Sequence, residues 1–353
     1  MIGPMKRRRN LSYYLLIPLT ALGSPAHAQE RLNRLPPERF DVIPPETRVR
    51  GAPGEMSVWQ TACRIGPPAN ARRRIVDIAL QEWGYFGFQV VDAARVERRL
   101  LPPGLIVDAL NPATRPHIAR GYPRLGVNEA AEEVAAVIAG YWSATPDGAR
   151  VLAQQNRAWT GPGRDAVTWL QPWSAAFVSW VMCEAGLGAP EQFRRDASHR
   201  LYVDQAIRAR DGLEPNAAYV AYDTGEQEIV PGDLLCNGRG TANYRNLADR
   251  RPDMGMFAAT HCDIVVKVDE AAIRFLVIGG NINESVSLTI LPAMRDAGRE
   301  LRPVDESSID GARTVFAHLK LRAEPIEARA LENTPTIRTL TEPLLDQRLI
   351  REE

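Results

Sequence analysis

The stretch Pro172–Trp180, with the sequence PWSAAFVSW, decides the fold of this chain of 353 residues. It opens an apolar segment that runs to about Ala185 and stops at Gly186 and Gly188, which predicts a helix with a defined end. Ser174 stands at the start of that helix. Unpaired backbone N–H groups and the positive end of the helix dipole lie there, and they stabilise a thiolate or a developing oxyanion. The stretch therefore predicts both a helix and a polar site at its N-terminus.

Helices precede the strands along this chain. Apolar residues recur at helical spacing from Ala71, and Asn128 can cap a second helix. The expected helices cover about residues 71–83, 128–142, 174–185 and 198–208, the last capped by Asp196 or Ser198. Beyond Pro231 the period changes, and strands are expected at residues 234–236, 264–268, 273–278, 286–290 and 315–321. Helices followed by an antiparallel sheet make an α+β fold.

The N-terminus reads as a secretory signal. Basic residues Lys6–Arg9, an apolar run Leu11–Leu22 and small residues at Ala26 and Ala28 form its three parts. The run is shorter than the roughly 20 residues that span a bilayer, although an uncleaved anchor is an alternative. We expect an exported protein, periplasmic or secreted. The expected organisation is a signal peptide at 1–28, a Pro-rich extended leader at 29–56, one α+β domain at 57–324 and a polar tail at 325–353, with a long loop at 101–126.

The charge balance and the cysteine content argue against nucleic-acid binding, attraction to anionic lipid and a zinc site. The 43 Lys and Arg balance the 43 Asp and Glu, so no global field favours nucleic acid or anionic lipid. We expect no nucleic-acid partner and no stable membrane span after signal cleavage. Four cysteines in an exported chain make disulfides plausible, and Cys236 with Cys262 is the pair that the expected neighbouring strands favour. The cysteine spacing fits no zinc site, so neither a metal nor another cofactor is expected.

Polar residues in the strand region extend the site that Ser174 begins. His261 falls at a strand start, and Asp263 shares its face by the two-residue period. Asn281 follows Gly279–Gly280, where the backbone can bend closely around a site. In a nucleophile–base–orienter triad, the His takes the proton and the third group fixes its tautomer. We therefore expect Ser174 as nucleophile and His261 as general base. Asn281 is the expected orienter and Asp263 the second choice.

Each of these residues also has a structural interpretation. Ser174 can be a simple helix N-cap, and His261 a structural histidine on a strand. His199 and Tyr202 are three residues apart and share a helix face, which lines the cleft or belongs to the core. The tryptophans around this helix, Trp169, Trp173 and Trp180, are expected to pack in the core, with Trp173, which precedes the cap, as the exception expected to contact a ligand. The expected substrate-binding residues are Trp173, His199, Tyr202 and Asp263.

Several motifs together resemble a known group of hydrolases. PWSAAFVSW resembles the Trp-Cys-Ala-x-Phe-Val-x-Trp nucleophile helix of CHAP-type and NlpC-type papain-like amidases and peptidases. Pro231–Leu234 is similar to their Pro-Gly-Asp-Leu strand. His261 before Ile264–Val266 resembles their His strand, and Ile278–Asn281 their Gly-Gly-Asn turn.

Residues 70–320 resemble more closely the bacterial family called domain of unknown function 2272 (DUF2272). That family has the same Trp-Ser-Ala-Ala-Phe segment, a helix with Ser, His and Tyr (Ser198, His199 and Tyr202 here) and the same Gly-Gly-Asn. The resemblance implies a papain-like fold and a site made by Ser174, His261 and Asn281.

For the CHAP relatives, the resemblance also implies hydrolysis of peptidoglycan amide bonds. The expected partner is then peptidoglycan or an envelope peptide or protein. Ser174 departs from the usual Cys of these enzymes, which leaves two alternatives open. One is a catalytically inactive module that binds a cell-wall glycopeptide or envelope partner, and the other is a structural envelope protein.

Overall fold

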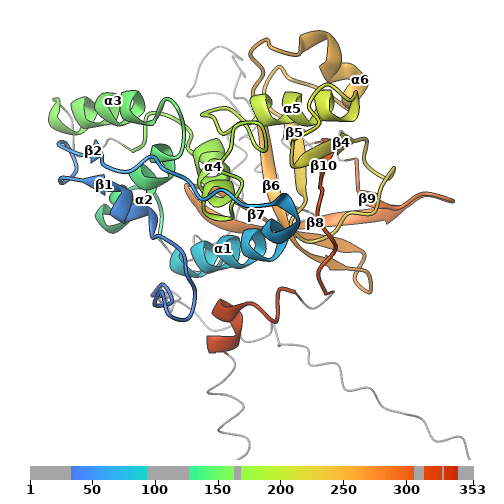
Figure 1. Cartoon of the computed structure of the whole chain (residues 1–353), viewed down its shortest axis with the longest axis horizontal. Coiled ribbons are helices and arrows are strands. Elements are labelled where there is room, and N and C mark those ends of the chain that lie inside the picture. Colours follow the sequence, from blue (N-terminus) through green and yellow to red (C-terminus); the bar gives the residue numbers. More distant parts are fainter. Residues whose placement is uncertain (1–32, 94–126, 163–167, 306–313, 328–329, 341–353) are drawn as a thin grey trace, which may run out of the picture.

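The structure is a computed structural model that describes residues 33–93, 127–162, 168–305, 314–327 and 330–340. The expected signal peptide and the expected loop at 101–126 therefore lie outside the described residues. The described chain is a mixed α+β structure in which helices pack on a large sheet (Figure 1).

The helices are α1 (Ala71–Tyr85), α2 (Glu132–Ser143), α3 (Gly148–Thr160), α4 (Ser174–Glu184), α5 (Arg200–Arg210) and the short α6 (Leu247–Arg250). Short 3-10 helices cover Pro45–Arg48, Pro68–Asn70 and Arg251–Asp253. Helix α4 has the predicted start, and it ends before Gly186, whose φ of 102° is one that glycine adopts readily. Asn128 does not cap α2, because its side chain accepts from the N–H of Ala130 in the turn that precedes the helix.

The main sheet contains β3 (Gln89–Asp92), β4 (Tyr219–Tyr222), β5 (Leu234–Gly238), β6 (Thr260–Asp269), β7 (Arg274–Ile282), β8 (Ser285–Arg295), β9 (Leu301–Pro303) and β10 (Val315–Leu321). The strand order is β3-β8-β7-β6-β5-β10-β4, with β9 also beside β8. A separate pair is formed by β1 (Val49–Arg50) and β2 (Ser57–Val58). All five predicted strands are present.

The expectation of a purely antiparallel sheet is wrong at one edge. Strand β3 pairs with β8 in parallel, so the sheet is mixed. This strand follows α1 directly and is only four residues long, too short for an alternating pattern to reveal it. The α+β class itself is confirmed.

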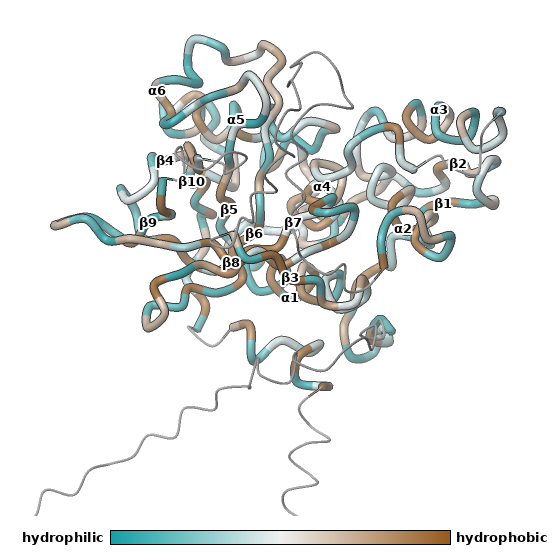
Figure 2. Tube along the Cα trace, turned by 180° about the vertical axis from the view of Figure 1, so that it is seen from behind, coloured by the Kyte–Doolittle hydropathy of each residue, from teal (hydrophilic) through white to brown (hydrophobic). Residues whose placement is uncertain are grey.

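Alternate residues along the central strands face two separate cores. In β5, Leu234 and Cys236 join the large core between the sheet and helices α1 and α4. Leu235 between them joins a smaller cluster, as the two-residue period of a strand requires for the opposite face. Every residue of α4 is buried, so this helix is the centre of the large core. Figure 2 shows the hydrophobic stretches along α4, β7 and β8, where helices and sheet meet.

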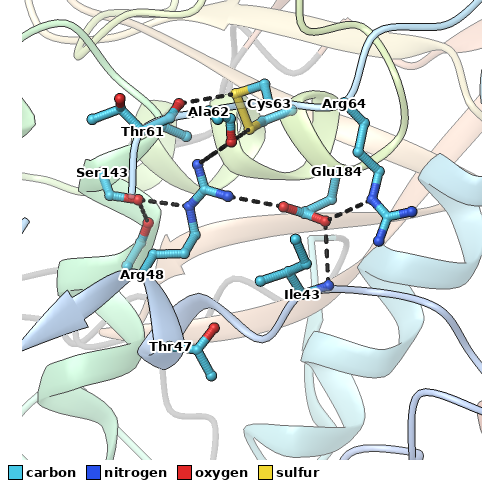
Figure 3. A network of polar contacts seen from close by, with 12 residues as sticks. Ile43, Thr47, Arg48, Thr61, Ala62, Cys63, Arg64, Ser143 and Glu184 are labelled. Carbon is cyan, nitrogen blue, oxygen red and sulfur yellow. Dashed lines mark hydrogen bonds and ion pairs between the residues drawn. A yellow bond between two sulfur atoms is a disulfide. The ribbon is translucent and has the colours of Figure 1, made fainter. Parts of the chain in front are cut away.

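Two disulfides use all four cysteines. Cys236 and Cys262 are directly opposite each other in the β5–β6 register and are bonded, as the sequence favoured. The second bond joins Cys63 to Cys183 near the end of α4, across 120 residues of sequence (Figure 3).

The segments outside the predicted domain also contact it where they are described. Phe40, Val42 and Met56 belong to the large core, although they fall in the stretch expected to be an extended leader. At the other end, Ala330 and Thr336 are buried and lie near α1. Among the described residues, no helix has the length and apolarity needed to cross a membrane.

Candidate functional site

The site begins at the first turn of α4. Ser174 is the first residue of the helix, and its hydroxyl lies 2.8 Å from Nε2 of His199 instead of capping the helix. Ser174 is 5% exposed, so the hydroxyl lies just beneath the surface. The N-cap interpretation of Ser174 therefore does not describe this side chain, because its hydroxyl is part of a contact between α4 and the start of α5.

His199 is held from its other side by two groups. Its Nδ1 accepts from the backbone N–H of Cys262 at 3.2 Å and also lies against the hydroxyl of Tyr202. Tyr202 is buried beside Phe193, with ring centroids 4.7 Å apart. Burial, and then the nearby charge of Asp263, raise the pKa of the Tyr202 hydroxyl well above its ordinary value, so the phenol keeps its proton.

His261 lies beside His199 and is paired with a carboxylate. Its ring centroid is 5.1 Å from that of His199, and its Nε2 lies 2.7 Å from Oδ1 of Asp263. His261 is fully buried, whereas the Asp263 side chain is 15% exposed. The two residues share a strand face, as the period of β6 predicted.

Gly279 on β7 makes room for this pair. A Cβ on Gly279 would lie 2.0 Å from Oδ1 of Asp263 and 3.1 Å from Nε2 of His261. A Cβ on Gly280 would lie 2.5 Å from the Cβ of Phe177 on α4. The two glycines therefore serve different contacts, one with the imidazole–carboxylate pair and the other with the helix.

Asn281 lies against the start of α4. In the amide orientation that the neighbouring donors require, its side-chain oxygen accepts from the backbone N–H of Trp173 at 3.1 Å and from the indole N–H at 3.2 Å. Its φ of 55° is in the left-handed region, which Asn tolerates better than most residues. Asp263 thus occupies the place beside His261 that was expected for Asn281, and Asn281 positions the residue before Ser174.

Two of the expected substrate contacts belong to the core in this structure. Trp173 is fully buried and stacks near Phe86 and Tyr141, with centroids 6.0 and 5.9 Å away. Tyr202 is buried as described above. Glu129, which the sequence did not single out, accepts from the same indole N–H of Trp173 at 2.7 Å, so this hydrogen is shared with Asn281 and lies closer to Glu129. Burial raises the pKa of the Glu129 carboxyl. Nothing in the sequence pattern around Glu129 marks this contact, because it joins residues 44 apart.

The titratable groups gathered at the site are the imidazoles of His199 and His261 and the carboxylate of Asp263. No group of three or more His, Cys, Asp or Glu in the described chain could hold a metal ion. A surface hollow of about 390 Å³ lies over the paired strands β4 and β10, lined by residues such as Val220, Tyr222 and Lys320. None of the site residues lines it.

Comparison with known proteins identifies a family for this chain, but finds no match among curated proteins or solved structures. A family model matches residues 131–321, which is more than half of the chain and includes Ser174, His199, His261 and Asn281. Helix α1 and strand β3 lie before the matched region. The chain therefore belongs to DUF2272, a family described as uncharacterized proteins conserved in bacteria.

Proposed function

We propose that this protein is an exported cell-envelope hydrolase that cleaves amide or peptide bonds, with peptidoglycan as its substrate class and a papain-like arrangement of helix and sheet. One observation carries the proposal: the Ser174 hydroxyl lies at a helix N-terminus, 2.8 Å from the imidazole of His199, and the centroid of that ring is 5.1 Å from a second imidazole that is paired with a carboxylate. A hydroxyl, an imidazole and a carboxylate are the groups that serve as nucleophile, base and orienter in such hydrolases.

In the proposed reaction, Oγ of Ser174 attacks the carbonyl carbon and its proton passes to His261, whose ring neighbours that of His199, the imidazole in contact with Oγ. Asp263 accepts from Nε2 of His261, so Nδ1 is the nitrogen that takes a proton. Backbone N–H groups of Ser174 or Ala175 stabilise the oxyanion, a contribution often worth about 10²–10³ in rate. The protonated His261 then gives its proton to the leaving amine, and water hydrolyses the acyl-enzyme.

The proposed location is supported by the cysteines. Both disulfides close within the folded domain and leave no free thiol. Structural disulfides persist in oxidising compartments such as the bacterial periplasm. This agrees with the secretory signal expected at residues 1–28.

The test compares three forms of the mature chain on purified sacculi. We expect the wild type to release muropeptides and Ser174→Ala to lose this activity by about 10³-fold or more. Ser57→Ala is the control substitution, because this serine is exposed on β2, in the separate β1–β2 pair. Equal release by wild type and Ser174→Ala contradicts a nucleophilic Ser174.

A non-catalytic binding module is the second candidate. It is favoured by the low exposure of Ser174 and by serine in place of the usual cysteine. It predicts that sacculi bind the wild type and Ser174→Ala equally, with no bond cleavage by either. In that case Ser174→Cys is the variant to assay for acquired cleavage.

A further inference from the structure

The contacts of His199 determine which of its two nitrogens carries a proton. A backbone N–H can only donate, so the Cys262 amide at 3.2 Å requires a lone pair on Nδ1. The single hydrogen of a neutral imidazole then lies on Nε2. That nitrogen is the one 2.8 Å from Oγ of Ser174, so in this arrangement the ring donates to the hydroxyl.

Tyr202 agrees with this assignment. Its hydroxyl also lies against Nδ1 of His199, and a phenol hydroxyl can donate as well as accept, so it can fill the donor role that this assignment gives it. The opposite tautomer would place an N–H on Nδ1 facing the N–H of Cys262, which leaves a buried donor unsatisfied. Cys262 is also fixed by its disulfide to Cys236 and by its place in the β5–β6 register, so this amide cannot easily turn away.

We infer that His199 is a positioning residue locked as an Nε2–H donor to Ser174, and not the base that takes the Ser174 proton. The inference rests on the proposed function and narrows it. A base at Nε2 needs a lone pair there, as in the nucleophile–base pair of a triad. With His199 donating to Oγ, the Ser174 O–H is directed to a different acceptor, which the proposal assigns to His261.

Three substitutions separate a donor from a base. The amide of Gln can replace an Nε2–H donor but cannot take a proton. We therefore expect His199→Gln to keep kcat/KM on sacculi within about tenfold of wild type, while His199→Ala loses more. His261→Gln should lose about 10²–10⁴-fold, the usual contribution of a general base. A loss in His199→Gln as large as that in His261→Gln overturns the inference.

A spectroscopic test needs no activity. Long-range ¹H–¹⁵N spectra of the ¹⁵N-labelled mature chain distinguish protonated from unprotonated ring nitrogens, and the His199 signals are those lost in His199→Gln. We expect an unprotonated Nδ1 and a protonated Nε2 at mildly alkaline pH. The same result is expected in Tyr202→Phe, since the Cys262 amide stays in place. A protonated Nδ1 in the wild type overturns the inference even if no substrate is cleaved. An inactive wild type with the expected tautomer rejects the proposed hydrolase and leaves the assignment of His199 standing.

Discussion

Gly279 is the residue whose size determines whether His261 and Asp263 can meet. The pair spans the space that a side chain at position 279 would fill, and Oδ1 of Asp263 lies only 2.0 Å from the place of a Cβ. Real Cβ atoms do not tolerate such a contact, so a methyl group there must move the carboxylate. The conformation of Gly279 is not the constraint, because its φ is not among the positive values. The constraint is space.

We expect Gly279→Ala to abolish most hydrolysis while the protein still folds. The methyl group displaces Asp263 from His261, and the unoriented imidazole loses the tautomer that the proposed reaction needs. A loss of about 10²–10⁴-fold in muropeptide release is expected, the range of a general base. Asp263→Asn is the matched variant, because it keeps the side-chain shape and removes the charge. Full activity in Gly279→Ala, with an unchanged circular dichroism spectrum, contradicts the role of the His261–Asp263 pair.

Helix α1 shows how a buried charge can lower the stability of an element. Asp77 is 7% exposed, and burial raises its pKa to about 7 despite the opposing charges of Arg73 and Arg74. The C-terminal segment covers this helix, since Arg73 donates to the carbonyl of Ala330 and a Cβ on Gly84 would meet Thr336. When Asp77 is ionised, its carboxylate is therefore buried on α1 with little access to water.

We expect Asp77→Asn to stabilise the protein above about pH 7 and to have no effect through this charge below about pH 4. The folded pKa lies above the unfolded value of 3.8, so stability falls as pH rises between the two values. The difference between the folded and unfolded pKa values of Asp77 corresponds to about 4 kcal/mol as an upper bound. We expect Asp77→Asn to raise the free energy of unfolding by about 1–3 kcal/mol. Urea unfolding across this pH range measures it.

Asp211→Asn is the control of opposite sign for Asp77→Asn. The hydrogen bond from Arg251 lowers the pKa of Asp211, so removing this charge should slightly destabilise the protein at neutral pH. A destabilised Asp77→Asn at alkaline pH contradicts the proposed cost of burying Asp77.

At the scale of elements, the sequence was most informative where a pattern is long and local. Helix α4 and the five predicted strands have strong apolar periods or clear glycine boundaries, and they were found. Strand β3 and helix α3 were not predicted. Four residues carry no period, and the buried face of α3 contains only two large apolar residues, Val151 and Leu152. Both elements depend on the partners that they meet in the fold.

At the candidate site too, the sequence predicted local patterns and missed a contact between distant residues. The two-residue period of β6 placed His261 and Asp263 on one face, and the Cys236–Cys262 bond followed from neighbouring strands. The contact between Ser174 and His199 could not be read from the sequence, because it depends on how the loop before α5 returns to α4. A pairwise contact across 25 residues leaves no periodic signal.

Across the whole molecule, α4 is fixed at both ends by segments distant in sequence. At its start, Asn281 binds Trp173 and His199 binds Ser174. At its end, Glu184 is buried and accepts from Arg48 at 3.0 Å and from Arg64 at 3.3 Å, as Figure 3 shows. The two guanidinium groups oppose the cost of burying this carboxylate, but burial outweighs the charge of Glu184 at Arg48 and lowers the pKa of that guanidinium.

The Cys63–Cys183 bond completes this attachment of the N-terminal segment to α4. Arg48 also lies 3.6 Å from Sγ of Cys183 and donates to the carbonyl of Ala62, so the bond and the ion pairs form one cluster (Figure 3). The chain-entropy model relates the stabilisation by a disulfide to the length of the loop that it closes. The separations of 120 and 26 residues correspond to about 5 kcal/mol for Cys63–Cys183 and about 3.5 kcal/mol for Cys236–Cys262.

We therefore expect the two double variants to separate stability from site chemistry. Cys63→Ala with Cys183→Ala should lower the free energy of unfolding by about 2–5 kcal/mol, measured by urea titration, and should leave the His199 tautomer unchanged. The Cys236–Cys262 bond closes a shorter loop, so Cys236→Ala with Cys262→Ala should lower the free energy of unfolding by less. It releases the strand whose amide holds Nδ1 of His199, however, so it should alter the ¹⁵N signals of this ring. An unchanged His199 spectrum in the second variant means that the amide is held by the sheet alone, because the β5–β6 register then suffices without the sulfur bridge.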